Sequence, residues 1–247
     1  MYNRASHPAD KGAHAVSTEV RLDFLRTVPM LSGMDDDEIQ RLAADLKRRS
    51  VAAGEAIFFQ DDPGHAVYII ASGRVRIYVH GEDGREMSVA IYQPGDLFGE
   101  MALLDRQPRS ATAEAMEHSV LLTMSAQDFF SHLRQSHQLT LNLMMALSHR
   151  LRETTQSMES LTTLDVNRRL IRKLLQLAGQ QGLVKKDGIH LRGRLTQQSL
   201  ASLIGASRES VNRALRALAR AGLIAVQHGR ITILEPQELE RLAESGD

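Results

Sequence analysis

The sequence has 247 residues, with 30 Lys and Arg against 30 Asp and Glu, so its formal net charge is zero. By itself that balance argues against a nucleic-acid-binding protein, because such proteins usually carry a basic surplus. Cysteine is absent, which excludes disulfides, thiolate zinc sites, cysteine-ligated iron–sulfur clusters and cysteine nucleophiles.

The charge is distributed unevenly along the chain. Residues 1–165 contain 16 Lys and Arg against 23 Asp and Glu, a net charge of −7, whereas residues 166–234 contain 13 against 2, a net charge of +11. Residues 235–247 carry a net charge of −4. A chain of this length accommodates two ordinary domains. An acidic front module and a basic back module predict two domains with different partners.

The front module begins with a polar segment and continues into a strand-rich region. Residues 1–18 show no periodicity and no apolar signal-peptide core, so we expect a disordered leader. Helices are predicted at 19–27 and 35–48, the second acidic at its start and basic at its end. Short apolar runs then alternate with turn residues up to about residue 125. This spacing, which starts at about residue 49, predicts an antiparallel barrel or jelly roll within a domain that spans 19–125.

The pattern becomes helical over 126–164. Residues alternating three and four positions apart form a coiled-coil seam, which predicts a homodimerisation helix: Met144, Leu147, Leu151, Thr154, Met158 and Leu161. Thr154 places a hydroxyl where an apolar side chain belongs, and Thr155 adds a second. The pattern alone leaves open whether Thr154 is a tolerated polar seam residue or a functional group.

The basic module, residues 165–234, has the pattern of a winged helix-turn-helix. Helices are predicted at 165–179, 196–203 and 207–221, followed by a hairpin with its turn at 227–230. Residues 235–247 are predicted to be a separate acidic tail. No apolar run approaches the ~18–20 residues that span a bilayer, so we expect a cytoplasmic protein with no membrane partner.

The helix at 207–221 carries the candidate DNA-reading residues. Gly205 suits a left-handed turn, and Ser207 suits the N-cap of the helix. The first turns then expose Arg208, Glu209, Asn212 and Arg213, and such side chains hydrogen-bond to base edges in the major groove. Glu209 alone could equally complement the helix dipole. The other basic residues are expected to contact phosphate or be solvated: Arg168, Arg169, Lys185, Lys186, Arg192, Arg194 and Arg230.

A second motif lies in the strand-rich region. Gly99 allows close backbone approach, Glu100 can accept hydroxyl groups, and Arg109 with Ser110 can bind an oxyanion. These are the groups that a ribose phosphate needs. The residues alone leave a plain salt bridge between Glu100 and Arg109 as an alternative.

Two motifs give the chain a family resemblance. The segment GEMALLDRQPRSAT is similar to the phosphate-binding cassette of cyclic-nucleotide-binding domains, and the segment SRESVNRAL carries an equally specific match in the helix-turn-helix. From about residue 20 to 234 the sequence resembles the CRP/FNR family of bacterial transcription regulators, especially its cAMP receptor branch. The resemblance implies an α+β protein with an N-terminal cyclic-nucleotide-binding jelly roll, a long dimerisation helix and a C-terminal winged helix-turn-helix.

The resemblance also implies a ligand site for cAMP. Glu100 would hold the ribose 2′-hydroxyl with Gly99 and Met101 beside it, and Arg109 with Ser110 would bind the cyclic phosphate. Thr154 would meet the adenine from its own subunit, and Thr155 from the partner subunit. This would account for the hydroxyl groups in the seam.

A DNA site follows from the same resemblance. Arg208, Glu209 and Arg213 match base-reading residues for a TGTGA-like half-site, Gln198 and Ser207 resemble phosphate contacts, and Asn212 completes the set. The segment 180–194 corresponds to a region that touches RNA polymerase in the family.

The implied function is a cAMP-responsive regulator that binds a palindromic DNA site as a homodimer. A regulator that binds DNA without ligand, or responds to another ligand, is the alternative. A haem sensor would need axial ligands such as His, and four of the ten His residues fall in apparent turns or on polar faces: His65, His80, His118 and His132. An enzyme would show a motif such as GxSxG, a P-loop or HExxH, and none occurs. We therefore expect no catalytic residue, metal, haem or iron–sulfur cluster.

Overall fold

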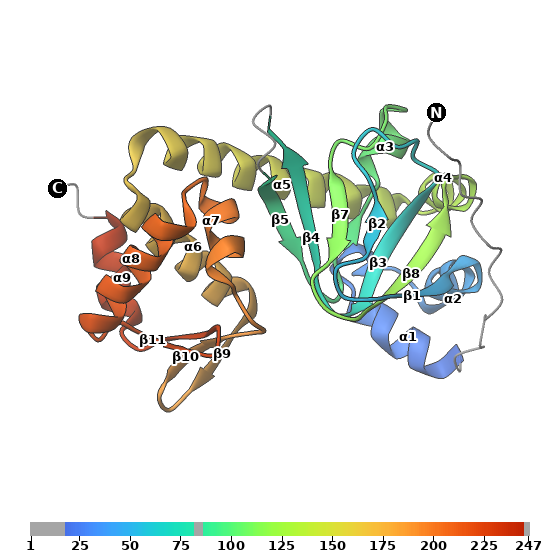
Figure 1. Cartoon of the computed structure of the whole chain (residues 1–247). Helices are drawn as coiled ribbons and strands as arrows, with labels where there is room; N and C mark the ends of the chain where they lie inside the picture. Colours follow the sequence, from blue (N-terminus) through green and yellow to red (C-terminus); the bar gives the residue numbers. More distant parts are fainter. Residues whose placement is uncertain (1–17, 82–85, 245–247) are drawn as a thin grey trace. The chain divides into compact units, whose positions relative to one another are not determined.

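The computed structural model describes residues 18–81 and 86–244, with side chains except those of 18–21, 156–163 and 244. The chain divides into two compact units (Figure 1). One comprises the residues up to Arg76 together with Ile91–Ala146, and the other comprises Ile77–Ala90 and the residues from Leu147 onward. The division runs through helix α5 (His137–Thr163). The segment 126–164 is therefore shared between the units and is not a unit of its own.

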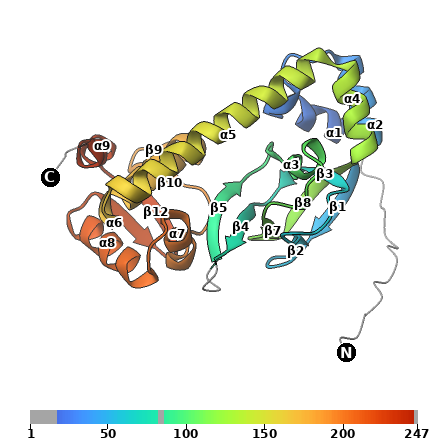
Figure 2. The ribbon, with the colours of Figure 1, turned by 90° about the horizontal axis from the view of Figure 1, so that it is seen from above.

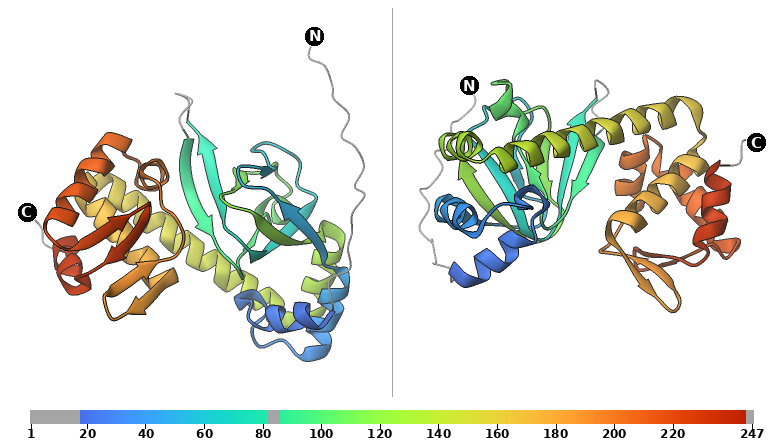
Figure 3. Two further views of the ribbon diagram at one scale, coloured as in Figure 1. Left: turned by 60° about the horizontal axis from the view of Figure 1, so that its bottom comes forward. Right: turned by 180° about the vertical axis from the view of Figure 1, so that it is seen from behind.

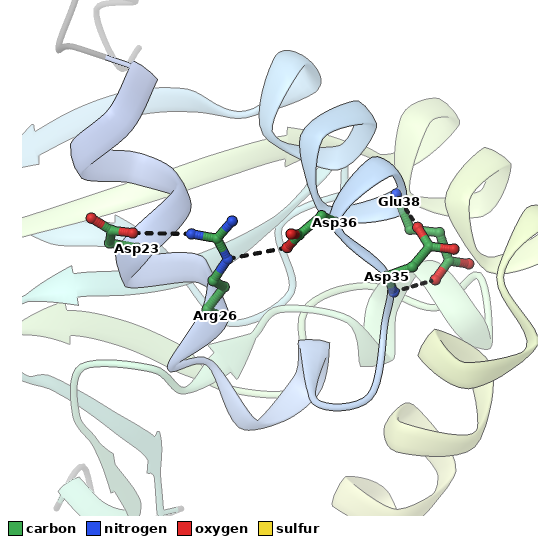
Figure 4. Close-up of polar contacts among 5 residues, drawn as sticks. All are labelled: Asp23, Arg26, Asp35, Asp36 and Glu38. Carbon is green, nitrogen blue, oxygen red and sulfur yellow. Dashed lines mark hydrogen bonds and ion pairs between the residues drawn. The ribbon is translucent and has the colours of Figure 1, made fainter.

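The first unit begins with two helices, α1 (Thr18–Arg26) and α2 (Asp36–Asp45). The start of α2 is a capping box, in which Asp35 accepts from the Glu38 amide at 2.7 Å and Glu38 accepts from the Asp35 amide at 3.1 Å (Figure 4). Each bond satisfies an amide that has no partner inside the helix. Arg26 joins the two helices by contacting both Asp23 and Asp36 at 3.1 Å.

Helix α2 is shorter than the sequence predicts. It ends at Asp45, and the residues expected to form its last turn instead form strand β1 (Lys47–Val51), which pairs antiparallel with β8 (Ser119–Ser125). Leu46 and Val51 are buried at 4% and 0% exposure. Pairing with a strand about 70 positions away outweighs the favourable placement of basic residues at a helix end, and local charge patterns do not report that pairing.

Eight strands of the front part of the chain form two four-stranded sheets, which confirms the predicted mixed fold with an N-terminal sheet domain. One sheet has the order β1-β8-β3-β6 and the other β2-β7-β4-β5. Their remaining members are β2 (Ala56–Phe58), β3 (Ala66–Ser72), β4 (Val75–His80), β5 (Glu86–Tyr92), β6 (Leu97–Phe98) and β7 (Thr112–Ala115). Fully buried side chains such as Ile70 and Leu121 lie on β3 and β8, the central strands of the first sheet.

The continuous helical pattern predicted over 126–164 is broken at Ser136. Helix α4 (Ala126–Gln135) ends there, and α5 begins at His137, with the Ser136 hydroxyl accepting the Leu139 amide at 3.2 Å. Helix α5 is the long helix of Figure 2. Of the predicted seam, Met144 and Leu151 are 50% and 69% exposed and Leu147 is half-buried, whereas the side chains of Met158 and Leu161 lie outside the described residues. None of the described helices combines the length and apolar character needed to cross a membrane.

The back of the chain folds around helices α6 (Val166–Gln181), α7 (Gln197–Ile204) and α8 (Arg208–Arg220). A four-stranded sheet of order β11-β12-β10-β9 completes it (Figure 3). The sheet contains β9 (Gly182–Lys185), β10 (Gly188–Leu191), β11 (Ile224–Gln227) and β12 (Arg230–Ile233). The segment 180–194 therefore contains the β9–β10 hairpin.

The acidic C-terminal segment is not a separate tail. Residues Pro236–Glu244 form helix α9, which packs against α6. Leu239 and Ala243, four positions apart, are 0% and 7% exposed and join the core that contains Leu170 and Leu174. Glu238, Glu240 and Arg241 of this helix are exposed. The negative charge of this segment predicts that it is separate from the basic module. In the structure its apolar residues pack into the core of that module.

Leu239→Ala is expected to lower the free energy of unfolding of the C-terminal unit by about 2–5 kcal/mol, because it removes a fully buried side chain. Urea unfolding followed by circular dichroism measures the change. Leu242→Ala, on the same helix but 36% exposed, is the control and is expected to cost much less. Equal effects of the two substitutions would contradict the packing of α9.

Candidate functional site

The predicted cassette occupies the connection from β6 through the short helix α3 (Met101–Leu104) to β7. Gly99 lies at its start with φ +83°, a conformation that disfavours side chains. A Cβ at this position would lie 2.9 Å from Nη1 of Arg109 and 3.2 Å from the Tyr68 ring. Glycine is therefore required both by the backbone conformation and by the close approach of Arg109.

Two opposite charges of the cassette are buried. Glu100 is 1% exposed and Arg109 is 3% exposed. The Arg109 guanidinium donates from Nη1 to the Gly99 carbonyl at 2.5 Å and from Nη2 to the Ala66 carbonyl at 2.8 Å. It also lies 4.2 Å from the centre of the Phe58 ring. Carbonyl dipoles and an aromatic face together stabilise a cation that has been removed from water.

The electrostatics of Arg109 show both the cost of its burial and the groups that oppose that cost. Burial lowers the pKa of Arg109, while Tyr68, Glu100 and Asp62 act to raise it. Its Nε atom is also buried and has no hydrogen-bond partner among the described residues. A buried guanidinium with an unused donor fits an anionic ligand. The Arg109 guanidinium contacts two carbonyls and an aromatic ring, and the charge of Glu100 acts on it in addition.

The turn at Asp61 and Asp62 holds the backbone of Arg109 through two hydrogen bonds. The Asp61 amide donates to the Arg109 carbonyl at 2.9 Å, and the Arg109 amide donates to the Asp62 carbonyl at 2.8 Å. Asp61 adopts φ +67°, unusual for a residue with a side chain, so this turn is held by its surroundings. Sequence reasoning missed this loop and Phe58. Neither has a local signal, because only pairing of β2 with β7 places them beside the cassette.

The cassette residues predicted from the sequence lie together. Ser110 and Met101 are exposed beside the buried pair, with the Ser110 hydroxyl 4.0 Å from the Met101 sulfur. Thr154 and Thr155 are exposed on α5, in the second unit, and their hydroxyls donate to the Arg150 and Leu151 carbonyls at 2.9 and 3.0 Å. Their approach to a ligand stays a prediction.

The residue before these threonines joins α5 to α6. Glu153 accepts hydrogen bonds from the side-chain amides of Gln176 and Gln180, each at 2.8 Å. Lys173 donates to Gln176 at 2.9 Å, and burial lowers its pKa while Glu153 acts to raise it. The sequence offered no sign of this network, because Glu153 lies more than 20 positions from Gln176 and Gln180.

The helix-turn-helix has the geometry that the sequence predicts. Ser207 caps α8 by accepting the Ser210 amide at 3.1 Å, and Val211 is buried while Arg208 and Glu209 are exposed. Gly205, in the turn, adopts the left-handed conformation with φ +59°. The side of α8 that faces solvent near its start thus carries the predicted base-reading groups.

The remaining residues that are predicted to bind DNA differ in their exposure and in their hydrogen bonds. Gln198 is exposed in the first turn of α7, and Arg213 is exposed with one nitrogen 3.3 Å from the Ser210 hydroxyl. Asn212 is half-buried and accepts a hydrogen bond from Gln197 at 3.1 Å, which ties α8 to α7. Among the other basic residues, Arg194 donates from Nε to the His228 carbonyl at 3.0 Å, so this nitrogen makes a hydrogen bond within the protein.

Comparison with known proteins agrees with both parts of this description. Residues 48–136 match the model of the cyclic nucleotide-binding domain, and residues 168–242 match that of the Crp-like helix-turn-helix domain. The chain is 34% identical to the cyclic AMP receptor protein of Thermus thermophilus over 215 residues, 87% of this chain and 96% of the relative. The chain belongs to the CRP/FNR family.

Two further relatives of this CRP/FNR regulator are informative. The CRP-like cAMP-activated global transcriptional regulator of Mycobacterium tuberculosis is 31% identical over 221 residues, 90% of this chain and 99% of the relative. The structure of the c-di-GMP responsive global regulator CLP of Xanthomonas campestris superposes with a TM-score of 0.69 at 28% identity, covering 81% of this chain and 99% of the other. The protein is thus a transcription regulator rather than an enzyme, with a domain for a cyclic nucleotide and a domain for DNA.

Gly99→Ala is expected to displace Arg109 and to weaken cyclic-nucleotide binding at least tenfold, because the added methyl group would meet the guanidinium at 2.9 Å. Calorimetric titration with cAMP measures the affinity. Gly54→Ala is the control, since Gly54 also has a positive φ, +78°, but nothing lies within 4 Å of the added carbon. Loss of binding in both variants would assign the effect to backbone strain.

Proposed function

We propose that this CRP/FNR regulator is a cytoplasmic homodimer that binds cAMP and, in the ligand-bound state, reads a palindromic DNA site. The observation that carries the proposal is the buried Glu100–Arg109 pair inside a domain that matches cyclic nucleotide-binding domains. A buried carboxylate and a buried guanidinium provide one acceptor for a hydroxyl and one fork for a phosphate. Ribose and cyclic phosphate are the two halves of a cyclic nucleotide that such groups would bind.

The ligand contacts follow from the positions of these groups. Arg109, already held by two carbonyls, would direct its remaining donors to the cyclic phosphate, and the Ser110 hydroxyl would add a further hydrogen bond. Glu100 would accept the ribose 2′-hydroxyl, with Gly99 and Met101 forming the adjacent wall. Because these charges are held in place before binding, the ligand meets an electrostatically prepared site.

Dimerisation would use helix α5. Four of its apolar side chains are at least 36% exposed in the single chain, and a partner helix would cover them: Leu141, Met144, Met145 and Leu151. In such a dimer Thr154 would contact the adenine in its own subunit, and Thr155 would contact the adenine of the partner. The ligand would thereby influence the packing of the dimer helices, and Glu153 joins this same segment to α6.

The DNA site would be read by α8 from each subunit. Two recognition helices related by a two-fold axis and about 34 Å apart fit successive major grooves on one side of the duplex. Arg208, Glu209 and Arg213 would read a TGTGA-like half-site, with Asn212 near them and Gln198 and Ser207 on phosphates. The +11 charge of residues 166–234 supports this placement.

RNA polymerase is the partner we propose for the β9–β10 hairpin. The hairpin exposes two apolar and two basic side chains next to one another: Leu183, Val184, Lys185 and Lys186. Val184 is 82% exposed, so an apolar side chain there is available to a protein partner.

A second candidate ligand deserves a direct comparison, because the Xanthomonas relative is described as c-di-GMP responsive. Calorimetric titrations with cAMP, cGMP and c-di-GMP distinguish the possibilities. The proposal expects cAMP to bind most tightly. Preference for another nucleotide, or DNA binding that no nucleotide alters, would replace it with the alternative function.

Arg109→Leu is expected to abolish most cAMP-dependent DNA binding, because switching a protein from mostly inactive to mostly active needs about 5 kcal/mol of differential ligand affinity. Gel-shift titration of a TGTGA…TCACA duplex with and without cAMP measures the dependence. Arg106→Leu makes the same charge change at an exposed position of the same loop and is expected to retain the response. Full cAMP dependence in Arg109→Leu would refute the mechanism.

Arg208→Ala and Glu209→Ala are each expected to cost about 1–3 kcal/mol in specific DNA binding and to relax base preference at one position per half-site. Binding to duplexes substituted at single positions measures this preference. Arg216→Ala, exposed two turns further along α8, is the control. A loss that is uniform across all sequences would mean that Arg208 and Glu209 contact only the phosphate backbone or support the fold.

A further inference from the structure

Arg169 is an arginine of the basic module whose side chain is turned toward the helix-turn-helix. It lies in the first turn of α6, after the N-cap Asp165, and is half-buried. Its Nη1 donates to the carbonyl of Ile204 at 2.7 Å and to that of Gly205 at 3.2 Å. Its Nε is buried without a hydrogen-bond partner among the described residues. This side chain is bonded to backbone 35 positions away in the sequence.

The two carbonyls belong to the end of α7, where backbone acceptors have no partner inside the helix. Gly205 reverses the chain in the left-handed conformation, and the amides of Gly205 and Ala206 both donate to the Ala201 carbonyl. That arrangement satisfies the Ala201 carbonyl, and Arg169 binds the Ile204 and Gly205 carbonyls. A cation at the negative end of the helix dipole is also electrostatically favoured there. Arg169 supplies both the donor and the charge.

The position of this turn determines where α8 begins. Ser207, the N-cap of α8, follows Gly205 by two residues, and Arg208 comes directly after it. A shift of the Gly205 carbonyl would move the start of α8 and its exposed side chains. Next to Arg169 on α6, Leu170 is fully buried in the core that includes Val211 of α8. The arginine and the core thus hold the turn from the same helix.

We propose that Arg169 is a positioning residue for DNA reading: it fixes the turn between α7 and α8 through the Ile204 and Gly205 carbonyls and makes no phosphate contact of its own. The inference rests on the proposed DNA-reading function of α8. Arg169 would thus contribute to sequence specificity, whereas a basic residue of this module is otherwise expected to contact phosphate or be solvated.

Arg169→Met removes the donors and the charge while keeping an apolar stem, and Arg172→Met, exposed three residues along the same helix, is the matched control with the same charge change. A site is first selected from random duplexes by the wild-type protein, with saturating cAMP present. Affinities for the selected and a random duplex are then measured over a salt series, at a temperature where circular dichroism shows each variant folded.

Arg169→Met is expected to lower the ratio of specific to random affinity by about tenfold, with the salt slope on random DNA matching that of the control. Arg169→Lys, which keeps the charge but cannot supply the planar fork, is expected to lower the ratio by about threefold and provides the test if the Met variant is unstable.

Three results would overturn the inference. Equal losses on both duplexes with a salt slope smaller by about 0.9 would show a phosphate contact. A lower unfolding temperature with an unchanged specificity ratio would show a purely structural role. A wild-type protein that enriches no sequence would refute the proposed function together with the inference, whereas the first two results leave the proposed function intact.

Discussion

The burial of the Arg109 charge is the constraint on which the front half of this regulator depends. Removing a guanidinium from water is costly unless polar groups replace the water, and here the Gly99 and Ala66 carbonyls do so with an aromatic face beneath. Each of these groups comes from a different segment. The jelly-roll pairing, the glycine turn and the loop at Asp61 must therefore all be in place before the site exists. A cyclic nucleotide would complete this arrangement rather than create it.

Helix α6 has a comparable position in the back half. Near its C-terminal end Gln176 and Gln180 bind Glu153 of α5, and near its N-terminal end Arg169 binds the turn that precedes α8. Between these contacts Leu170 and Leu174 are fully buried. The interactions at the two ends are polar, so they can exchange for water at lower cost than an apolar interface.

The net charge of the chain is zero, but the structure shows where opposite charges lie within its C-terminal module. Residues 166–234, with a net charge of +11, fold into one module together with the acidic helix α9. Leu239 of α9 is fully buried in the core that they share. Adding α9 makes the module less basic overall while leaving the start of α8 rich in arginine. The charge close to the recognition helix, rather than the net charge of the domain, determines the electrostatic potential at the DNA groove.

The sequence by itself determined the family and the two functional modules, and it predicted which residues of the cassette and of the recognition helix to propose as contacts. It could do so because these depend on local requirements: a glycine at a left-handed turn, a hydroxyl at an N-cap, apolar periodicity, and adjacent residues that act on one ligand group. Tertiary structure alone decided that α2 stops at Asp45, that α9 joins the core, that Phe58 lies against Arg109, and that Arg169 binds the turn. Each of these outcomes arises from a contact between distant segments, whose free energy does not appear in any local pattern.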